Sequence, residues 1–295
     1  MSLNPRLLEK LACPNCGNPL RYDILSDRLF CTIHSCNFAI SGDIPLLLSD
    51  RTDSEPTSDF DYVRHYETDA REFDYFEQQN GATEHSESRL RQTILSKIPT
   101  QAQSILDVGS GSAWVAKNLI PTKDLIVSMD ATIINTSKAL ERYPSPNHLA
   151  VVADAFALPF QTDTFDCVIA AEIIEHVTDP KAFVRSLLRV IPQGGVLIIS
   201  TPYKEVLRYG LCIHCNQKTP LNSHLHTFDE NVLHSLFEDE EIKNFEWDAF
   251  NNKALLFVRT HVVLRYLPFS FWSFIDKLAN LIYSRPVNIV LRVTK

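Results

Sequence analysis

From Ser104 onward, short apolar runs alternate with amphipathic stretches, and this alternation constrains the fold more than any other feature of the chain. The runs SILDVG, LIVSMD, HLAVVAD, FDCVIAA and GGVLIIS predict strands, each followed by a turn and a helical pattern such as PKAFVRSLLRVI. Strands that are separated by helices form crossover connections and parallel sheets with helices on both faces. The sequence therefore predicts an α/β fold with a mostly parallel sheet.

The stretch ILDVGSGSAW reads as a strand, a glycine turn and the start of a helix, which is where an open α/β sheet binds a nucleotide-like ligand. A pyrophosphate-binding loop would need glycine at position 114, but Trp114 stands there and disfavours a dinucleotide. What remains is Asp107, Gly109, Gly111 and Ala113, with a carboxylate available to a cationic or amine-bearing ligand. The alternative is a glycine turn that binds no ligand.

Two further carboxylates follow the next two predicted strands. Asp130 comes 23 residues after Asp107, close to the interval at which an acid meets ribose hydroxyls. Asp154 ends the third strand, where it could accept a hydrogen bond from an adenine amino group. We expect the three carboxylates to lie side by side along one edge of the sheet.

These stretches, together with ADAFALPFQTDTFDCVIAAEIIEHVTDPKAFVRSLLRVIPQGGVLIISTP, resemble the class I S-adenosylmethionine-dependent methyltransferases, especially the group that contains the ubiquinone-biosynthesis O-methyltransferases. The resemblance covers about residues 100–250 and implies a Rossmann-like, seven-stranded sheet. It departs from the family at Ser110, Ala113 and Gln193. The implied cofactor-binding residues are Asp107, Gly109 and Gly111 for the methionine part, Asp130 for the ribose, Asp154 and Ala155 for the adenine, and Glu172 at the cofactor edge.

The segment EIIEH places Glu172, Glu175 and His176 at the end of the fourth predicted strand. In a helical turn their spacing of i, i+3 and i+4 puts all three on one face. They could bind a hard cation, act as a base with its orienting acid, or be structural. Two related methyltransferase groups, the small-RNA 2′-O-methyltransferases and some ubiquinone-pathway enzymes, use E-x-x-E-H with a later His to bind a metal, and His224 resembles that later His.

Four cysteines near the start have the spacing of a zinc ribbon. Cys13 and Cys16 form one knuckle and Cys31 and Cys36 a second, with His34 as an alternative fourth ligand. The run resembles the zinc-ribbon proteins that activate eukaryotic methyltransferases, and more loosely the ribbon of a ribosomal-RNA guanine methyltransferase. Because the first 50 residues hold four basic and five acidic side chains, we expect structural zinc and a stabilising or protein-docking role.

A second candidate zinc site follows later in the chain. Cys212 and Cys215 precede His224 and His226, and together they would form a closed Cys2His2 site. Because His224 or His226 is required by both this site and a metal at EIIEH, the two hypotheses compete.

We predict three parts: a zinc-ribbon domain at 1–50, a linker and helices at 51–100, and a methyltransferase domain at 101–295. The domain includes an insertion at about 252–285, because VNIVLRV reads as a last strand after an aromatic helical stretch. The insertion is expected to be a lid over the active-site edge, with contact to a membrane surface as the alternative.

Composition limits the partners. The chain has 295 residues, a net charge of −8 and no continuous apolar stretch long enough for a signal peptide or a membrane span, so we expect a cytoplasmic protein and disfavour nucleic acid. The expected function is methyl transfer to a small or lipid-like acceptor through oxygen, nitrogen or carbon. The alternatives are an RNA methyltransferase that docks its substrate through the ribbon and a non-catalytic protein-binding scaffold.

Overall fold

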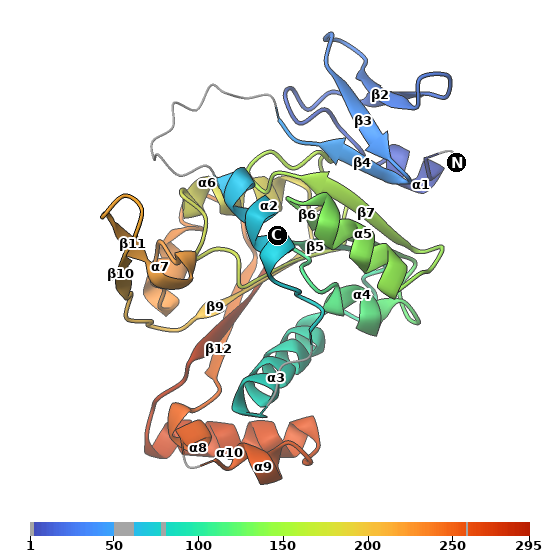
Figure 1. Cartoon of the computed structure of the whole chain (residues 1–295). Coiled ribbons are helices and arrows are strands. Elements are labelled where there is room, and N and C mark those ends of the chain that lie inside the picture. Colours follow the sequence, from blue (N-terminus) through green and yellow to red (C-terminus); the bar gives the residue numbers. More distant parts are fainter. Residues whose placement is uncertain (1–2, 50–61, 78–80, 258) are drawn as a thin grey trace. The chain divides into compact units, whose positions relative to one another are not determined.

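The structure is a computed structural model that describes residues 3–49, 62–77, 81–257 and 259–295 (Figure 1). The start of the predicted linker and helices at 51–100, residues 51–61, lies outside the described residues. The chain divides into two compact units, which are described separately. Unit 1 comprises Met1–Glu77, Pro99–Ile169 and Arg185–Gly195, and unit 2 comprises Gln78–Ile98, Ala170–Val184 and Val196–Lys295.

Unit 1 contains the expected alternation of strands and helices. Its last strand, β8, crosses the boundary between the units in the sequence, because the last two residues of β8 belong to the second segment of unit 2. The elements are α1 (Pro5–Leu8), β1 (Leu20–Asp23), β2 (Arg28–Cys31), β3 (Asn37–Ser41), β4 (Ile44–Leu47), α2 (Tyr62–Glu72), β5 (Ser104–Val108), α4 (Trp114–Leu119), β6 (Leu125–Asp130), α5 (Ile133–Arg142), β7 (His148–Ala153) and β8 (Cys167–Ala171).

The strands β5, β6 and β7 form the parallel centre of unit 1. β5 pairs with β6 and β6 with β7, both in parallel register, and β8 lies next to β5. Every residue of β6 is buried, which explains why the strand is apolar apart from Ser128 and its last residue, Asp130. Helix α5 packs on β6 and β7. The predicted α/β fold with a mostly parallel sheet is confirmed.

The N-terminal module joins this sheet directly. Its strands run in the order β1, β2, β3 and β4, each antiparallel to the next, and β4 then pairs in parallel with β7. The register sets Leu46 opposite Val152 and Leu47 opposite Ala153. The sheet of unit 1 therefore continues into the module, so the predicted count of seven strands is not confirmed. The predicted division at residues 50 and 100 stays a prediction.

Unit 2 is built around antiparallel strands. One helix, α6 (Pro180–Arg189), begins in unit 2 and ends in unit 1. The other elements are α3 (Gly81–Lys97), β9 (Val196–Pro202), β10 (Tyr209–Leu211), β11 (Lys218–Pro220), the 3-10 helix η1 (Leu221–Ser223), α7 (Glu230–Ser235), β12 (Asn244–Phe250), α8 (Lys253–Phe257), α9 (His261–Leu264), α10 (Phe269–Ile282) and β13 (Asn288–Thr294).

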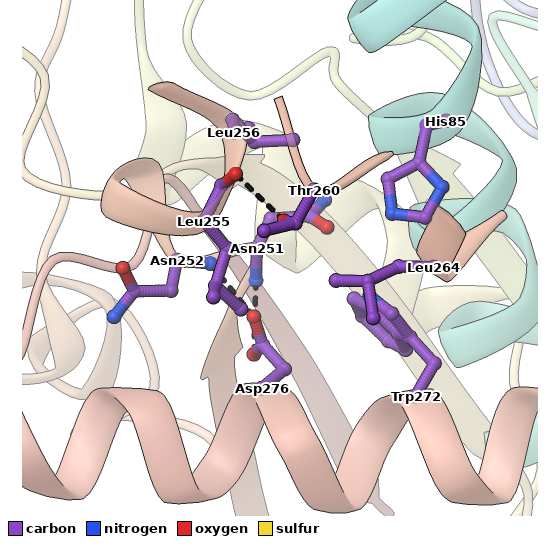
Figure 2. A pocket seen from close by; sticks show the side chains of 9 residues that line it. All are labelled: His85, Asn251, Asn252, Leu255, Leu256, Thr260, Leu264, Trp272 and Asp276. Carbon is purple, nitrogen blue, oxygen red and sulfur yellow. Dashed lines mark hydrogen bonds between the residues drawn. The ribbon is translucent and has the colours of Figure 1, made fainter. Parts of the chain in front are cut away.

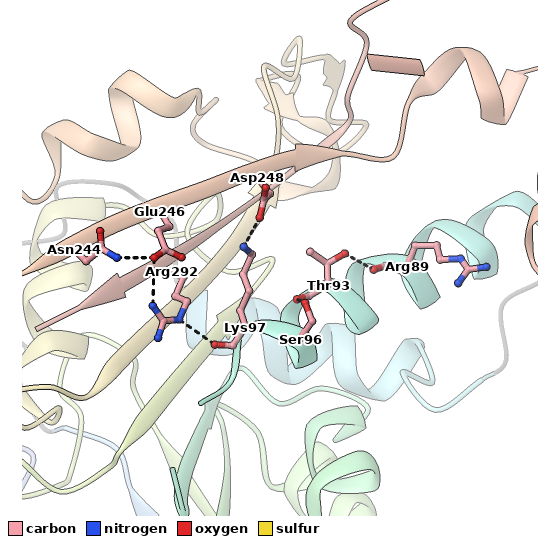
Figure 3. A network of polar contacts seen from close by, with 8 residues as sticks. All are labelled: Arg89, Thr93, Ser96, Lys97, Asn244, Glu246, Asp248 and Arg292. Atoms are coloured by element: carbon pink, nitrogen blue, oxygen red, sulfur yellow. Dashed lines mark hydrogen bonds and ion pairs between the residues drawn. The ribbon is translucent and has the colours of Figure 1, made fainter. Parts of the chain in front are cut away.

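In unit 2, β13 lies between β9 and β12 and is antiparallel to both. Helix α3 is attached to this sheet by polar contacts at its C-terminal end (Figure 3). The Lys97 ammonium pairs with the Asp248 carboxylate on β12, and Arg292 Nε on β13 donates to the Lys97 carbonyl at 3.2 Å. A single surface salt bridge contributes little to stability. Together, the ion pair and the hydrogen bond connect the end of α3 to two strands.

The predicted insertion is present as three helices between β12 and β13. Asn288, the first residue of β13, pairs with both Phe250, the last of β12, and Pro202, the last of β9. The segment α8 to α10 therefore leaves the sheet of unit 2 at the edge where β9 ends. Whether it is a lid stays a prediction. Among the described residues, no helix has the length and apolar character needed to cross a membrane.

Candidate functional site

The three carboxylates predicted at strand ends lie at one edge of the unit 1 sheet. Asp107 is the penultimate residue of β5, Asp130 is the last residue of β6, and Asp154 directly follows β7. Because these strands are parallel and paired in register, their carboxyl ends share an edge. This is the edge at which open α/β sheets bind their ligands.

The Asp130 carboxylate is held by the surrounding loops. Its Oδ2 accepts a hydrogen bond from the Gly111 N–H at 3.1 Å. Its Oδ1 accepts from the Thr132 N–H at 3.1 Å and from Asn135 Nδ2 at 3.3 Å. Asp130 thus connects the glycine loop after β5 to the start of α5.

Asp107 has the opposite character, because its carboxyl group is buried and incompletely paired. The residue is 2% exposed, and its Oδ2 atom has no hydrogen-bond partner in the described part of the chain. Burial, reinforced by the neighbouring charge of Asp130, raises the pKa of Asp107 to about 8. The Ser110 hydroxyl in the adjacent loop is likewise buried without a partner. Asp107 near the end of β5 and Ser110 in the turn that follows therefore leave hydrogen-bonding capacity for a polar ligand.

The turn between β5 and α4 has a left-handed backbone at three positions, with φ angles of 68° at Gly109, 44° at Gly111 and 51° at Ala113. A Cβ atom at Gly111 would lie 3.5 Å from the Tyr75 ring, so the loop passes close to that side chain. The third position carries an alanine and not the glycine typical of the resembled family. Ala113 nevertheless adopts the left-handed conformation that glycine favours, so an alanine is compatible with this turn.

Tyr75 is a candidate site residue that the sequence analysis missed. It lies between α2 and α3, its hydroxyl donates to the Asp69 carboxylate, and the charge of Asp130 contributes to the raised pKa of its phenol after burial and Asp69. The preceding residue, Asp74, pairs with Lys138 of α5 at 3.1 Å. No spacing or motif connects position 75 with the glycine loop, so nothing in the sequence signalled this placement.

The EIIEH segment lies in unit 2 and is not helical. Residues 173–176 form a turn and α6 begins only at Pro180. Glu172 adopts a left-handed backbone with φ of 56°. Its Oε1 accepts from the Ser200 hydroxyl at 2.8 Å, and burial raises its pKa to about 7. The helical turn that would place all three polar side chains on one face is therefore absent at residues 172–176.

Glu175 and His176 lie together with His224. One potential ligand atom from each lies within 4.8 Å of the others. Glu175 Oε2 accepts from the Thr201 hydroxyl at 3.0 Å, and the Glu175 carbonyl accepts from the Leu225 N–H at 2.7 Å. The second of these bonds joins the EIIEH turn to the segment that contains His224.

His224 is oriented by a second acid within the same unit. Its Nδ1 contacts a Glu205 oxygen, and its ring meets the His176 ring edge to face with centroids 4.8 Å apart. Glu175 itself is 1% exposed, and burial together with the nearby Glu172 raises its pKa well above the ordinary value. The arrangement of a buried carboxyl and two imidazoles can hold a cation or exchange a proton.

The proposed Cys2His2 set is not brought together. Among the described residues, no group of three potential metal ligands includes Cys212 or Cys215. His224 instead belongs to the Glu175 group, and His226 Nε2 is buried without a hydrogen-bond partner. β10 and β11 place Cys212 and Cys215 in the turn between them, whereas His224 lies beside Glu175 and His176.

The ribbon cysteines do converge. Ligand atoms of Cys13, Cys16 and Cys31 lie within 4.8 Å of one another, and the Cys16 and Cys31 sulfurs are 3.6 Å apart. Cys36 is not part of that group, although its carbonyl accepts from the Cys31 N–H at 3.0 Å. A disulfide has a sulfur separation of about 2.0 Å, so these thiols are not bonded to each other.

Comparison with known proteins agrees with this geometry. Residues 106–199 match the family described as "Methyltransferase domain". The match begins within β5 and ends within β9, so it contains the glycine loop and all three strand-end carboxylates. Over this stretch the chain is therefore similar to methyltransferase domains.

Among curated proteins, the chain is 28% identical over 134 residues to the demethylmenaquinone methyltransferase of Roseiflexus castenholzii, covering 44% of this chain and 56% of the relative. It is 30% identical over 118 residues to a ubiquinone biosynthesis O-methyltransferase of Colwellia psychrerythraea, covering 39% of this chain and 48% of the relative. The chain therefore spans about half the length of the curated relatives that it matches.

Solved structures share the fold at low identity. The [4+2]-cyclase SpnF matches with a TM-score of 0.51 and 17% identity, covering 74% of this chain and 84% of that chain. A chain from the Haloferax volcanii Trm112 methyltransferase activator complex matches with a TM-score of 0.51 and 15% identity, covering 80% and 99%. Because one of these proteins is named as a cyclase, the fold alone does not define methyl transfer.

Proposed function

We propose that this protein transfers a methyl group from S-adenosylmethionine to a small, quinone-type acceptor. The observation that carries the proposal is the buried, unpartnered Asp107 oxygen beside the left-handed turn at Gly109 and Gly111. The cofactor has an amino group that would complete the hydrogen bonding of Asp107, so the residues present fit it. When bound, it supplies a methyl group already activated by a sulfonium.

The residues of unit 1 would bind and orient the cofactor. Asp107, Gly109 and Gly111 would hold its methionine part, Asp130 its ribose, and Asp154 with Ala155 its adenine. The hydrogen bond from Gly111 to Asp130 supports this assignment, because it sets the loop and the ribose-binding acid in a fixed relation before a ligand arrives. Preorganisation of this kind reduces the cost of binding. A role of Glu172 at the cofactor edge stays a prediction.

The names of the relatives support the acceptor class. Demethylmenaquinone and ubiquinone precursors are named for two of them, and a ring hydroxyl or ring carbon would be the nucleophile. The net charge of −8 favours a small molecule over RNA. Catalysis would come mainly from alignment of the nucleophile with the methyl group, and a hydroxyl acceptor would in addition need a base.

Calorimetry with S-adenosylmethionine tests cofactor binding. We expect the wild type to bind and Asp107→Asn to bind at least tenfold more weakly, because the amide cannot neutralise an ammonium group. Asp124→Asn is the matched control, because Asp124 is exposed in the turn before β6. If the folded wild type does not bind the cofactor, the protein is a non-catalytic scaffold and the proposal is wrong.

A transfer assay with labelled cofactor tests the acceptor. Separate pools of hydroxylated quinols, phospholipids and RNA are offered to the wild type and to Asp107→Asn. We expect label in the quinol pool with the wild type only. Label in the RNA pool would instead support the alternative in which the ribbon docks RNA.

We propose further that Glu175, His176 and His224 bind a divalent cation. The support is their convergence, together with the Glu205 contact that leaves His224 Nε2 as its potential ligand atom. We expect calorimetry with Mn²⁺ or Zn²⁺ to detect a site that His224→Ala abolishes and His234→Ala, on α7, leaves intact. An unchanged titration in His224→Ala would contradict the cation site, and activity in Glu175→Gln then tests a role as a base.

For the ribbon we propose a structural zinc ion bound by Cys13, Cys16, Cys31 and Cys36. Tetrahedral coordination with zinc–sulfur bonds of about 2.3 Å gives sulfur separations of about 3.8 Å. The 3.6 Å between Cys16 and Cys31 is close to that value. The balanced charge of the ribbon supports a docking surface for a protein partner, which a pull-down with the zinc-loaded chain would test.

A further inference from the structure

The helical insertion, α8 to α10 between β12 and β13, buries polar side chains and exposes apolar ones, the reverse of an ordinary surface helix. Figure 1 shows its helices together at the end of β12, beside α3. On α10 the buried positions include an acid, Asp276, whose carboxylate oxygens accept from the N–H groups of Asn251 and Asn252 at 3.1 and 2.7 Å (Figure 2). Asn280, one turn later, donates to the same carboxylate at 3.0 Å. The face that α10 turns toward the protein is therefore partly polar.

The outward face of α10 is apolar. Phe271, Phe274, Leu278 and Leu281 follow each other at intervals of three and four residues and so form one stripe. They are 53%, 64%, 47% and 83% exposed, whereas Asp276 on the other face is 1% exposed. A helix on the surface of a globular protein normally buries such a stripe. A continuous exposed stripe of large apolar side chains indicates a surface that contacts something apolar.

The orientation of the insertion is fixed by packing and is not a result of loose attachment. Arg89 of α3 is 3% exposed and donates from one terminal nitrogen to the Leu264 and Leu267 carbonyls at 2.6 and 2.9 Å. Its guanidinium also lies 5.1 Å from the centre of the Trp272 ring. These contacts hold the end of α9 and the first turn of α10, so the stripe stays outward.

The insertion that carries the apolar stripe is also positively charged. Between β12 and β13 the only acidic residue is the buried Asp276, whereas all five basic residues are exposed: Lys253, Arg259, Arg265, Lys277 and Arg285. This concentration is opposite to the net charge of −8 of the whole chain. Two of the arginines lie over tyrosine rings, Arg265 over Tyr266 and Arg285 over Tyr283. Tyrosine and arginine both have an apolar body and a polar end, which suits a boundary between hydrocarbon and water.

We propose that the helical insertion docks the protein on an anionic lipid bilayer, with α10 lying in the headgroup layer. The apolar stripe would enter the boundary with the acyl chains, and the five cations would face lipid phosphates. A second copy of the chain fits less well, because a symmetric contact through this face would bring the same cations together. The inference rests on the insertion alone and does not depend on methyl transfer.

Vesicle flotation tests the proposal with the full-length protein. Vesicles of phosphatidylcholine alone are compared with vesicles that also contain phosphatidylglycerol, at low and at high salt. We expect binding to the anionic vesicles, weaker binding at high salt and little binding to the neutral ones. We expect the bound fraction of Phe274→Ser/Leu281→Ser to fall about tenfold, because two apolar anchors are lost.

The control replaces a pair of apolar residues outside the insertion that is, as a pair, at least as exposed as Phe274 and Leu281. Ile24→Ser/Leu25→Ser changes side chains that are 74% and 97% exposed in the β1–β2 turn, and its binding should match the wild type. Lys277→Ser/Arg285→Ser should lose the preference for anionic vesicles. Thermal unfolding of each variant checks the fold. Absence of wild-type binding, equal binding by Phe274→Ser/Leu281→Ser, or a dimer in light scattering that this variant abolishes would each overturn the proposal.

Discussion

Two buried carboxyl groups, Asp107 and Asp130, end neighbouring parallel strands and are stabilised differently. Asp130 accepts several hydrogen bonds, which counteract the effect of burial on its raised pKa. Asp107 has a free buried oxygen and a pKa of about 8. In the ligand-free protein Asp107 is therefore largely protonated at neutral pH, and a cationic ligand would favour the charged form.

Asp107→Asn should make the ligand-free protein more stable at pH 7 by about 1–2 kcal/mol. A carboxyl group with a raised pKa binds its proton more tightly in the folded chain than in the unfolded one. The wild type therefore loses stability as the pH rises from about 4 toward 8, and the amide removes this loss. Denaturant unfolding across that pH range measures it. A pH dependence as steep in Asp107→Asn as in the wild type would contradict the assignment.

The strand-end acids could be predicted because each follows an apolar run whose period and length define a buried strand. Tyr75 could not be predicted, because its position beside the glycine loop depends on how the segment between α2 and α3 folds back. The left-handed backbone of Glu172 was also beyond the sequence, since a glutamate gives no signal for that conformation. The group of potential metal ligands in the described residues contains Glu175 and His176 together with His224, and Glu172 is not part of it.

At the scale of elements, the turn before β9 contains two neighbouring glycines that are needed for different reasons. Gly194 has a φ of 86° and open space around it. A Cβ at Gly195 would lie 2.6 Å from Ile191 Cγ2 and 3.0 Å from the Pro192 carbonyl oxygen. The first glycine is thus required by backbone conformation and the second by the close approach of neighbouring atoms.

Gly195→Ala should destabilise the protein by about 2 kcal/mol or more, because a backbone atom and a buried side chain must move. Gly194→Ala should cost about 1 kcal/mol, which reflects only the strain of a left-handed alanine. Chemical denaturation of both variants under the same conditions gives the comparison. An equal loss in the two variants would contradict the explanation that Gly195 is required by the close approach of neighbouring atoms.

The elements themselves were mostly predictable, and the errors have identifiable causes. The runs SILDVG, LIVSMD and HLAVVAD became β5, β6 and β7, because uninterrupted apolar stretches of this length are typical of buried parallel strands. The EIIEH residues do not form a helix, and the next helix, α6, starts only at Pro180, where proline is favourable at a first helical position.

At the scale of the whole molecule, the N-terminal module is joined to the main sheet of unit 1. Besides the β4–β7 pairing, the Ala12 N–H donates to the Pro159 carbonyl at 2.8 Å and the Lys10 ammonium to the Thr164 carbonyl at 3.1 Å. The cysteine spacing identified the module, but no local signal specifies which distant strand will pair with β4. Its role as the neighbour of β7 therefore had to come from the structure.

This pairing predicts that zinc removal will affect more than the ribbon. If zinc holds the cysteine knuckles, its loss should loosen β4, and β7 should then become an exposed edge. We expect faster amide exchange at Leu46 and Leu47 and also at Val152 and Ala153 after chelation, measured by hydrogen exchange with mass spectrometry. Cys16→Ser should reproduce the effect, whereas Cys215→Ser, on the β10–β11 hairpin, should not. If the ribbon amides exchange faster while those of β7 stay protected, β7 does not depend on the metal-bound ribbon for its protection.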